Sequence, residues 1–176
     1  MPMPRRQHKR QLPIVWLTGN SGSGKTTLAT MLRDQLEEAG ITHKILLLDG
    51  DELRRTISID DDLSPAGRRN HNLRVARLAR LLQEQGCLVI VAVIAPFAAV
   101  REEIDMLCAP LWVYIHRTMA ASPEKPYEAP ASPDYLIDHD RFSCAQSAET
   151  LSQALLQRLG PHLAEKNEYF ARHALS

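Results

Sequence analysis

The chain has 176 residues, of which 44% are hydrophobic and 24% are charged. This length suits one domain and excludes a second catalytic module, and the composition excludes wholesale disorder. Its 21 basic and 21 acidic side chains leave no net charge, which argues against nucleic acid as a partner.

The charges are distributed unevenly along the chain. Residues 1–11 hold four basic side chains and no acid, which leaves 17 positive and 21 negative charges in residues 12–176. We expect a disordered basic arm at residues 1–11 and a single domain at residues 12–176. The arm lacks the apolar segment of a secretory signal, and no run nears the roughly 18 apolar residues of a membrane span. A cytoplasmic protein without a membrane partner is predicted.

The first strand is expected at residues 12–18, before a glycine-rich loop and a helix at residues 25–39. The loop fits the GxxxxGK[ST] pattern. It consists of Gly19, Asn20, Ser21, Gly22, Ser23, Gly24, Lys25 and Thr26. Backbone N–H groups in such a loop surround phosphate oxygens at a helix start, while the lysine reaches the β- and γ-phosphates and the hydroxyl ligates Mg²⁺. The motif therefore predicts ATP and Mg²⁺ as cofactors.

The second strand, at residues 44–48, is followed by Asp49 and Asp51. Ligands of doubly wound sheets bind outside the carboxyl ends of the strands, so these carboxylates should lie near the phosphate loop. The third strand, at residues 87–94, is not followed by an acid. Asp49 or Asp51 is therefore the candidate to hold Mg²⁺ through water or to accept the proton of an acceptor hydroxyl. Which of the two is the base stays open.

The rest of the chain continues the alternation of strands and helices. We expect a loop at residues 60–67, a helix that ends at Gly86, a short helix at 98–107, a strand at 111–115, a loop at 116–134, a short strand at 135–137 and a helix at 148–159. This order is typical of an α/β fold of three layers, in which helices flank a central, mostly parallel sheet.

Five successive segments resemble the motifs of adenylylsulfate (APS) kinases, and their order and spacing match over about residues 14–138. The segments are residues 19–29, 48–54, 69–74, 94–101 and 126–130. The resemblance implies a P-loop NTPase/kinase fold and transfer of the ATP γ-phosphoryl group to the 3′-hydroxyl of APS, giving 3′-phosphoadenylyl sulfate for sulfate assimilation. Family members are often dimers, so a homodimer is an open alternative.

The resemblance also implies roles for single residues. Lys25, Asp49 and Asp51 would be catalytic, and Thr26 and Asp49 would hold the metal. ATP would be bound by the phosphate loop from Gly19 to Thr26 and by Thr27. The anionic group of the acceptor would be held by Arg54, Arg69 and Asn72, in a pocket completed by Pro96, Phe97 and Arg101.

Two departures from the family's pattern concern the acceptor. Arg68 stands where an acid usually precedes the arginine of the RxxN motif, which adds positive charge near the acceptor. Only residues 116–125 stand where family members carry a longer lid with an aromatic side chain that stacks on adenine. Phe97, Tyr127 or Phe142 would have to replace this aromatic, unless the acceptor is not APS.

Two alternatives remain beside APS kinase activity. The short lid favours a related kinase that acts on another activated nucleotide, such as cytidine diphosphoramidate or a polysaccharide precursor. A non-catalytic ATP-binding regulatory protein is the other, and the intact Lys25, Thr26, Asp49 and Asp51 argue against it.

Overall fold

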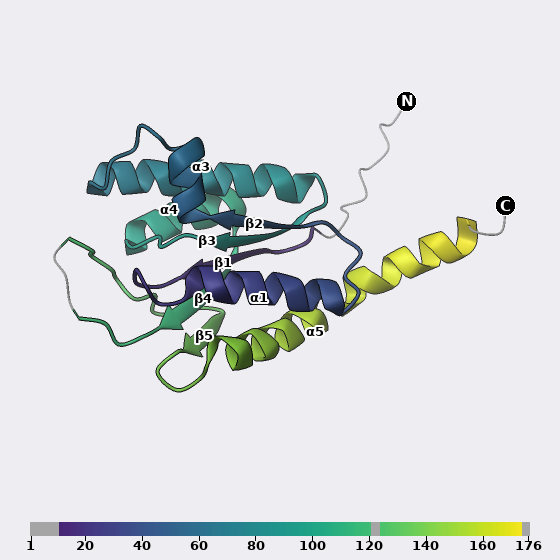
Figure 1. Ribbon diagram of the computed structural model, residues 1–176. Coiled ribbons are helices and arrows are strands. Elements are labelled where there is room, and N and C mark those ends of the chain that lie inside the picture. The colour runs from purple at the N-terminus through teal and green to yellow at the C-terminus, as the bar shows by residue number, and fades with distance from the viewer. Residues whose placement is uncertain (1–10, 121–123, 174–176) are drawn as a thin grey trace, which may run out of the picture.

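Five strands form the centre of the molecule, and helices cover both faces of the sheet (Figure 1). The computed structural model describes residues 11–120 and 124–173. The strands are β1 (Ile14–Thr18), β2 (Ile45–Asp49), β3 (Leu88–Ala92), β4 (Leu111–His116) and β5 (Tyr135–Asp138). The helices are α1 (Lys25–Glu38), α2 (Gly50–Thr56), α3 (Pro65–Glu84), α4 (Ala98–Cys108) and α5 (Cys144–His173).

The strands lie in the order β2-β3-β1-β4-β5, and each neighbouring pair is parallel. Helices α1 and α5 cover one face of the sheet and α3 and α4 the other (Figure 1). The predicted three-layer α/β fold is confirmed. Because all five strands run the same way, the loops that follow them gather at one edge of the sheet.

The two faces of the sheet bury two separate clusters of apolar side chains. On β1, Val15 and Leu17 point into the cluster that contains α1 and α5, while Trp16 points into the cluster on the other face. Trp16 is fully buried, and its Nε1 donates to the carbonyl oxygen of Val93 at 3.0 Å. Its ring packs against Trp112 with the ring centroids 5.4 Å apart. This alternation fixes which face each helix covers.

The structure adds one helix that the sequence did not predict and shortens one predicted loop. A short helix, α2, begins directly after β2, because the carboxylate of Asp49 accepts from the N–H groups of Asp51 and Glu52 and caps it. The predicted loop at residues 60–67 is partly helical. Its Ser64 caps α3 through the N–H of Gly67, and a proline occupies the first helical position.

The predicted basic arm lies outside the described residues except for residue 11. Within residues 11–120 and 124–173, none of the helices combines the length and the apolar character needed to cross a membrane.

Gly67 offers a test of the packing at the start of α3. Glycine to alanine within a helix usually stabilises a protein by about 0.5–1 kcal/mol. A Cβ at Gly67, however, would overlap the carboxylate and the backbone carbonyl of Asp62. We expect Gly67→Ala to lower the free energy of unfolding in urea by about 1–3 kcal/mol.

The matched control for this variant is Asn70→Ala, which places the same residue at an exposed position of the same helix. It should raise the free energy of unfolding by roughly 0.5 kcal/mol. Equal stabilisation by both substitutions would contradict the packing described for Gly67.

Candidate active site

A cleft of about 620 Å³ opens at the carboxyl edge of the sheet. The phosphate loop after β1 lines one side of it, and residues of α2 and α3 line the other. The connection from β4 to β5, residues 117–134, borders the cleft through Arg117 and residues 124–127. We call this connection the strap. The cleft thus joins loops that follow four of the five strands.

The phosphate loop encloses the side chain of Lys25. The Lys25 Nζ donates to the carbonyl oxygens of Gly19 at 2.9 Å and Asn20 at 2.6 Å, and only 8% of Lys25 is exposed. Gly24, with a φ of 98°, adopts the left-handed conformation that starts α1, and no side chain caps this helix start within the described residues. The uncapped N–H groups and the ammonium group therefore face one anion-binding hollow.

Burial lowers the pKa of Lys25 to about 8, and the carboxylates of Asp51 and Asp49 oppose this shift. The ammonium group is thus still mostly charged at neutral pH. A bound polyphosphate would favour the charged form further, since it adds negative charge next to the amine.

Asp49, Thr26 and Asp51 lie together beside this loop. Thr26 Oγ1 donates to Asp49 Oδ2 at 2.7 Å, while Asp49 Oδ1 caps α2. Hydroxyl and carboxylate oxygens are the ligands that Mg²⁺ prefers, directly or through water, so these two residues fit the predicted metal site. Asp51 lines the cleft, and its carboxylate accepts no hydrogen bond from the residues that the structure describes. Asp51 is therefore free to accept a proton from a substrate.

Two arginines line the opposite side of the cleft without an ionic partner. Arg54 donates to the backbone carbonyls of Asp61 and Asp62, and Arg68 donates to those of Leu63 and Glu124. Neither forms a salt bridge in the described part of the chain. The pKa of Arg54 is lowered by burial first and then by the charge of Arg68. The carboxylates of Asp61, Asp51 and Asp62 oppose this shift without forming a salt bridge to Arg54. Two adjacent guanidinium groups without a direct carboxylate partner among the described residues form a site suited to an anion.

The predicted acceptor residues divide into two groups. Arg54 and Pro96 line the cleft. Arg69 lies outside it, where its Nε donates to Glu103 Oε1 at 2.7 Å at the surface, and it borders a separate groove along α3. Successive side chains on a helix point about 100° apart, and here Arg68 lines the cleft while Arg69 is directed to Glu103 on α4.

The residues that follow Arg69 on α3 also differ from the prediction. Asn72 is 2% exposed, does not line the cleft, and donates through Nδ2 to the carbonyl oxygen of Arg68 at 2.8 Å. His71 lines the cleft instead. Burial and the neighbouring Arg54 lower the pKa of His71 to about 4, so its ring is neutral. The charge of Arg68 was expected near the acceptor, but neither Arg68 nor His71 was predicted from the sequence as an acceptor-binding residue. Their spacing of three residues, one helical turn, was the available signal.

Arg101 and Phe97, both predicted in the acceptor pocket, lie outside the cleft lining. Arg101 is 6% exposed and donates to the carbonyl oxygen of Ala95 at 2.8 Å. Its guanidinium lies 6.0 Å from the centroid of the Tyr127 ring, which lines the cleft. Phe97 packs against the apolar cluster on the α3 and α4 face. Neither Arg101 nor Phe97 is among the described residues that line the cleft.

Tyr127 and Glu128 fasten the far end of the strap to the body of the domain. The Tyr127 hydroxyl lies 3.0 Å from Thr18 Oγ1, and burial raises the pKa of Tyr127 to about 12, so the phenol stays protonated. Glu128 Oε2 accepts from the N–H of Ala98 at 2.6 Å, and the N–H of Glu128 donates to Pro96 at 2.8 Å. The strap is therefore tied to the loop between β3 and α4.

Comparison with known proteins agrees with this geometry. Residues 11–125 match the family described as adenylylsulphate kinase. The adenylyl-sulfate kinase of Burkholderia ambifaria is 42% identical over 102 residues, which cover 58% of this chain and 55% of that protein. The probable adenylyl-sulfate kinase of Bacillus subtilis is 30% identical over an alignment that covers 86% of this chain and 90% of that protein.

Solved structures give the same result. The APS kinase CysC of Mycobacterium tuberculosis, in complex with AMPPNP and APS, has a TM-score of 0.73 at 27% identity and covers 84% of this chain and 98% of that chain. Shikimate kinase from Acinetobacter baumannii, 18% identical with a TM-score of 0.54, shares the fold alone. The resemblance drawn from the motifs and the P-loop kinase fold are both confirmed.

The lowered pKa of Lys25 predicts a pH dependence of nucleotide binding. The free protein loses the charge of Lys25 as the pH rises through about 8, whereas Lys25 keeps its charge in the complex with a polyphosphate. The last ionisation of a phosphate group has a pKa of about 6, so it is largely complete by about pH 7. We expect the Kd for ADP to rise about tenfold between about pH 7 and pH 9, with proton uptake on binding.

Calorimetric titrations in two buffers with different ionisation enthalpies would measure both quantities. Lys44→Met, which removes an exposed lysine outside the cleft, is the control and should keep the same profile. A Kd that stays constant up to pH 9 would contradict the prediction.

Proposed function

The chain belongs to the adenylylsulphate kinase family of ATP-dependent phosphotransferases, and from this premise we propose that it phosphorylates adenylyl sulfate itself. The γ-phosphoryl group of ATP would pass to the 3′-hydroxyl of the acceptor and give 3′-phosphoadenylyl sulfate. The reaction would belong to sulfate assimilation. It consumes ATP, so we expect it to take place in the cytoplasm.

The observation that carries this proposal is the pair of unpaired arginines opposite the phosphate loop. Arg54 and Arg68 donate only to backbone carbonyls among the described residues, so their charges are available to an anionic acceptor. Adenylyl sulfate carries such a group next to its ribose. Binding that group at the arginines would direct the ribose hydroxyl toward Asp51 and the phosphate loop, which line the same cleft.

The roles of the remaining residues follow from their bonds. Asp51, whose carboxylate accepts no hydrogen bond from the described residues, would accept the hydroxyl proton as the general base. Asp49, engaged with Thr26 and with the start of α2, would instead hold Mg²⁺ together with Thr26. Mg²⁺ would neutralise charge that develops on the phosphate oxygens. Lys25 would bind the same oxygens from inside the loop.

The short strap bears on the choice of acceptor. Tyr127 lines the cleft, whereas Phe97 is partly buried against the apolar cluster on the α3 and α4 face and Phe142 is exposed after β5. Of the three aromatics considered as stacking surfaces, Tyr127 is therefore the one we propose. Leu63, 63% exposed, adds an apolar edge to the same cleft. A homodimer stays a prediction that the molar mass in solution would decide.

An assay of ADP release with a panel of acceptors tests the proposed function. With ATP and Mg²⁺, we expect turnover with adenylyl sulfate and the appearance of 3′-phosphoadenylyl sulfate. Asp51→Asn should lower kcat by at least about 100-fold, because it removes the general base and leaves the nucleotide contacts in place.

The panel should also contain cytidine diphosphoramidate and nucleotide-linked sugar precursors. Turnover with one of these and none with adenylyl sulfate would replace the proposed acceptor. If the wild type binds ATP but turns over none of these acceptors, and Asp51→Asn binds ATP equally well, the result would favour a regulatory ATP-binding protein.

Arg68 and Arg69 form a matched pair for testing the acceptor site. Arg68→Ala removes a guanidinium that lines the cleft, and we expect the KM for the acceptor to rise about 10- to 100-fold while the KM for ATP stays nearly constant. Arg69→Ala removes a surface guanidinium paired with Glu103 and should change both constants less than about twofold.

Steady-state kinetics with each substrate varied in turn would separate these effects. A larger effect from Arg69→Ala than from Arg68→Ala would restore the assignment made from the sequence.

A further inference from the structure

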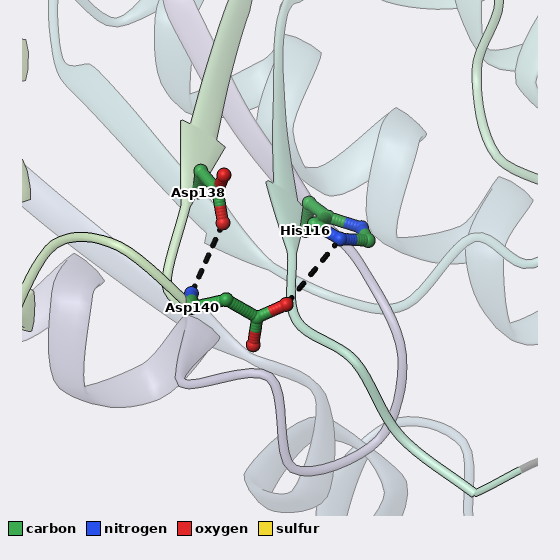
Figure 2. Close-up of side chains that lie close together, drawn as sticks. All are labelled: His116, Asp138 and Asp140. Carbon is green, nitrogen blue, oxygen red and sulfur yellow. Dashed lines mark hydrogen bonds and ion pairs between the residues drawn. The ribbon is translucent and has the colours of Figure 1, made fainter.

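Three side chains at the carboxyl ends of β4 and β5 lie together next to the strap (Figure 2). His116 and Asp138 are direct partners in the parallel pairing of these strands. The N–H of Asp140 donates to Asp138 Oδ1 at 3.0 Å, and Asp140 Oδ2 lies 3.5 Å from His116 Nε2. These contacts turn the carboxylate of Asp140 toward the chain that leaves β4.

Asp140 binds the first part of the strap through Thr118. The N–H of Thr118 donates to both carboxylate oxygens of Asp140, at 2.9 and 3.1 Å, and Thr118 Oγ1 donates to Oδ2 at 2.6 Å. These bonds lower the pKa of Asp140, as expected for a carboxylate that accepts hydrogen bonds in its charged form. The imidazole of His116 and the two carboxylates are also ligand types that suit a divalent ion, but no further observation among the described residues points to one there.

The residues on either side of Thr118 contact the phosphate loop. Arg117 Nη1 donates to the carbonyl oxygen of Gly22 at 3.3 Å. The Cε of Met119 lies so close to Gly22 that a Cβ there would be 3.2 Å away from it. From the loop after β5, His139 Nδ1 bonds to the carbonyl oxygen of Ser23 at 2.7 Å.

These contacts act on the orientation of peptide groups. In a trans peptide the carbonyl and the following N–H point in opposite directions, so a bond that fixes one also fixes the other. Holding the carbonyl of Ser23 therefore fixes the N–H of Gly24, and holding the carbonyl of Gly22 fixes the N–H of Ser23, which donates to Asn20 within the loop at 3.1 Å. A phosphate loop whose N–H groups are already oriented binds phosphate without ordering it first.

We propose that Asp140 is a positioning residue for nucleotide binding. Through Thr118 it holds Arg117 and Met119 against Gly22, and it thereby keeps the phosphate loop in the shape that receives the polyphosphate. The inference rests on the proposed function only in that this loop binds ATP. It does not depend on the identity of the acceptor.

Binding of a fluorescent ADP analogue and steady-state kinetics of the full chain test the proposal. We expect Asp140→Ala to raise the Kd for the analogue and the KM for ATP about tenfold, with the KM for the acceptor changed less than about twofold. Thr118→Val, which removes one of the three bonds, should raise both nucleotide constants about threefold.

Two further variants separate positioning from charge and from general stability. Asp140→Asn keeps an oxygen that accepts from Thr118 and should stay within about threefold of the wild type. Asp60→Ala removes an exposed carboxylate outside the cleft and should leave binding unchanged. If Asp140→Ala does not fold, Thr118→Val decides the outcome.

Wild-type affinity for the analogue in Asp140→Ala or, where that variant does not fold, in Thr118→Val would overturn the proposal. An equal rise in the KM values for ATP and acceptor would overturn it too, because general loss of structure gives that result. Failure of the wild-type protein to bind the analogue would instead remove the proposed function.

Discussion

The parallel alignment of the five strands is the constraint on which the rest of the molecule depends. It brings the phosphate loop, the start of α2, the loop before α4 and both ends of the strap to one edge of the sheet. Burial of two apolar faces holds this alignment, since β1 and β3 are buried along their whole length. The polar groups at the edge can therefore remain unpaired toward the cleft while the domain stays folded.

The charges at this edge follow a simple division. Lys25 is enclosed by carbonyl oxygens on one side of the cleft, Arg54 and Arg68 are held by carbonyl oxygens on the other, and Asp51 lies on the cleft wall between the two substrate sites that we propose. Carbonyl oxygens bond these cations directly, and the carboxylates near Lys25 and Arg54 form no salt bridge with them among the described residues. A direct carboxylate partner would compete with the phosphate and sulfate groups of the substrates. The carboxylate of Asp49 is instead engaged within the protein, because its oxygens accept from Thr26 and from the N–H groups at the start of α2.

The sequence predicted the parts of the site that depend on local order. The phosphate loop was found because its residues are contiguous and both neighbouring elements are strongly patterned. The start of α2 was missed because seven residues are too few for a periodic signal, and the capping role of Asp49 resembles an ordinary turn. Arg69 was chosen over Arg68 because a motif match does not report helix phase. Only the packing of α3 on the sheet decides which arginine faces the cleft.

The two ends of the strap are tied down separately, at Thr118 by Asp140 and at Tyr127 and Glu128 by the body of the domain. Extra residues between these ties would leave the ties intact, and each doubling of a flexible loop costs only about 0.6 kcal/mol of closure entropy. The length of this connection can therefore change during evolution with little loss of stability. Acceptor preference could diverge through insertions here while the phosphate-binding half of the enzyme stays the same.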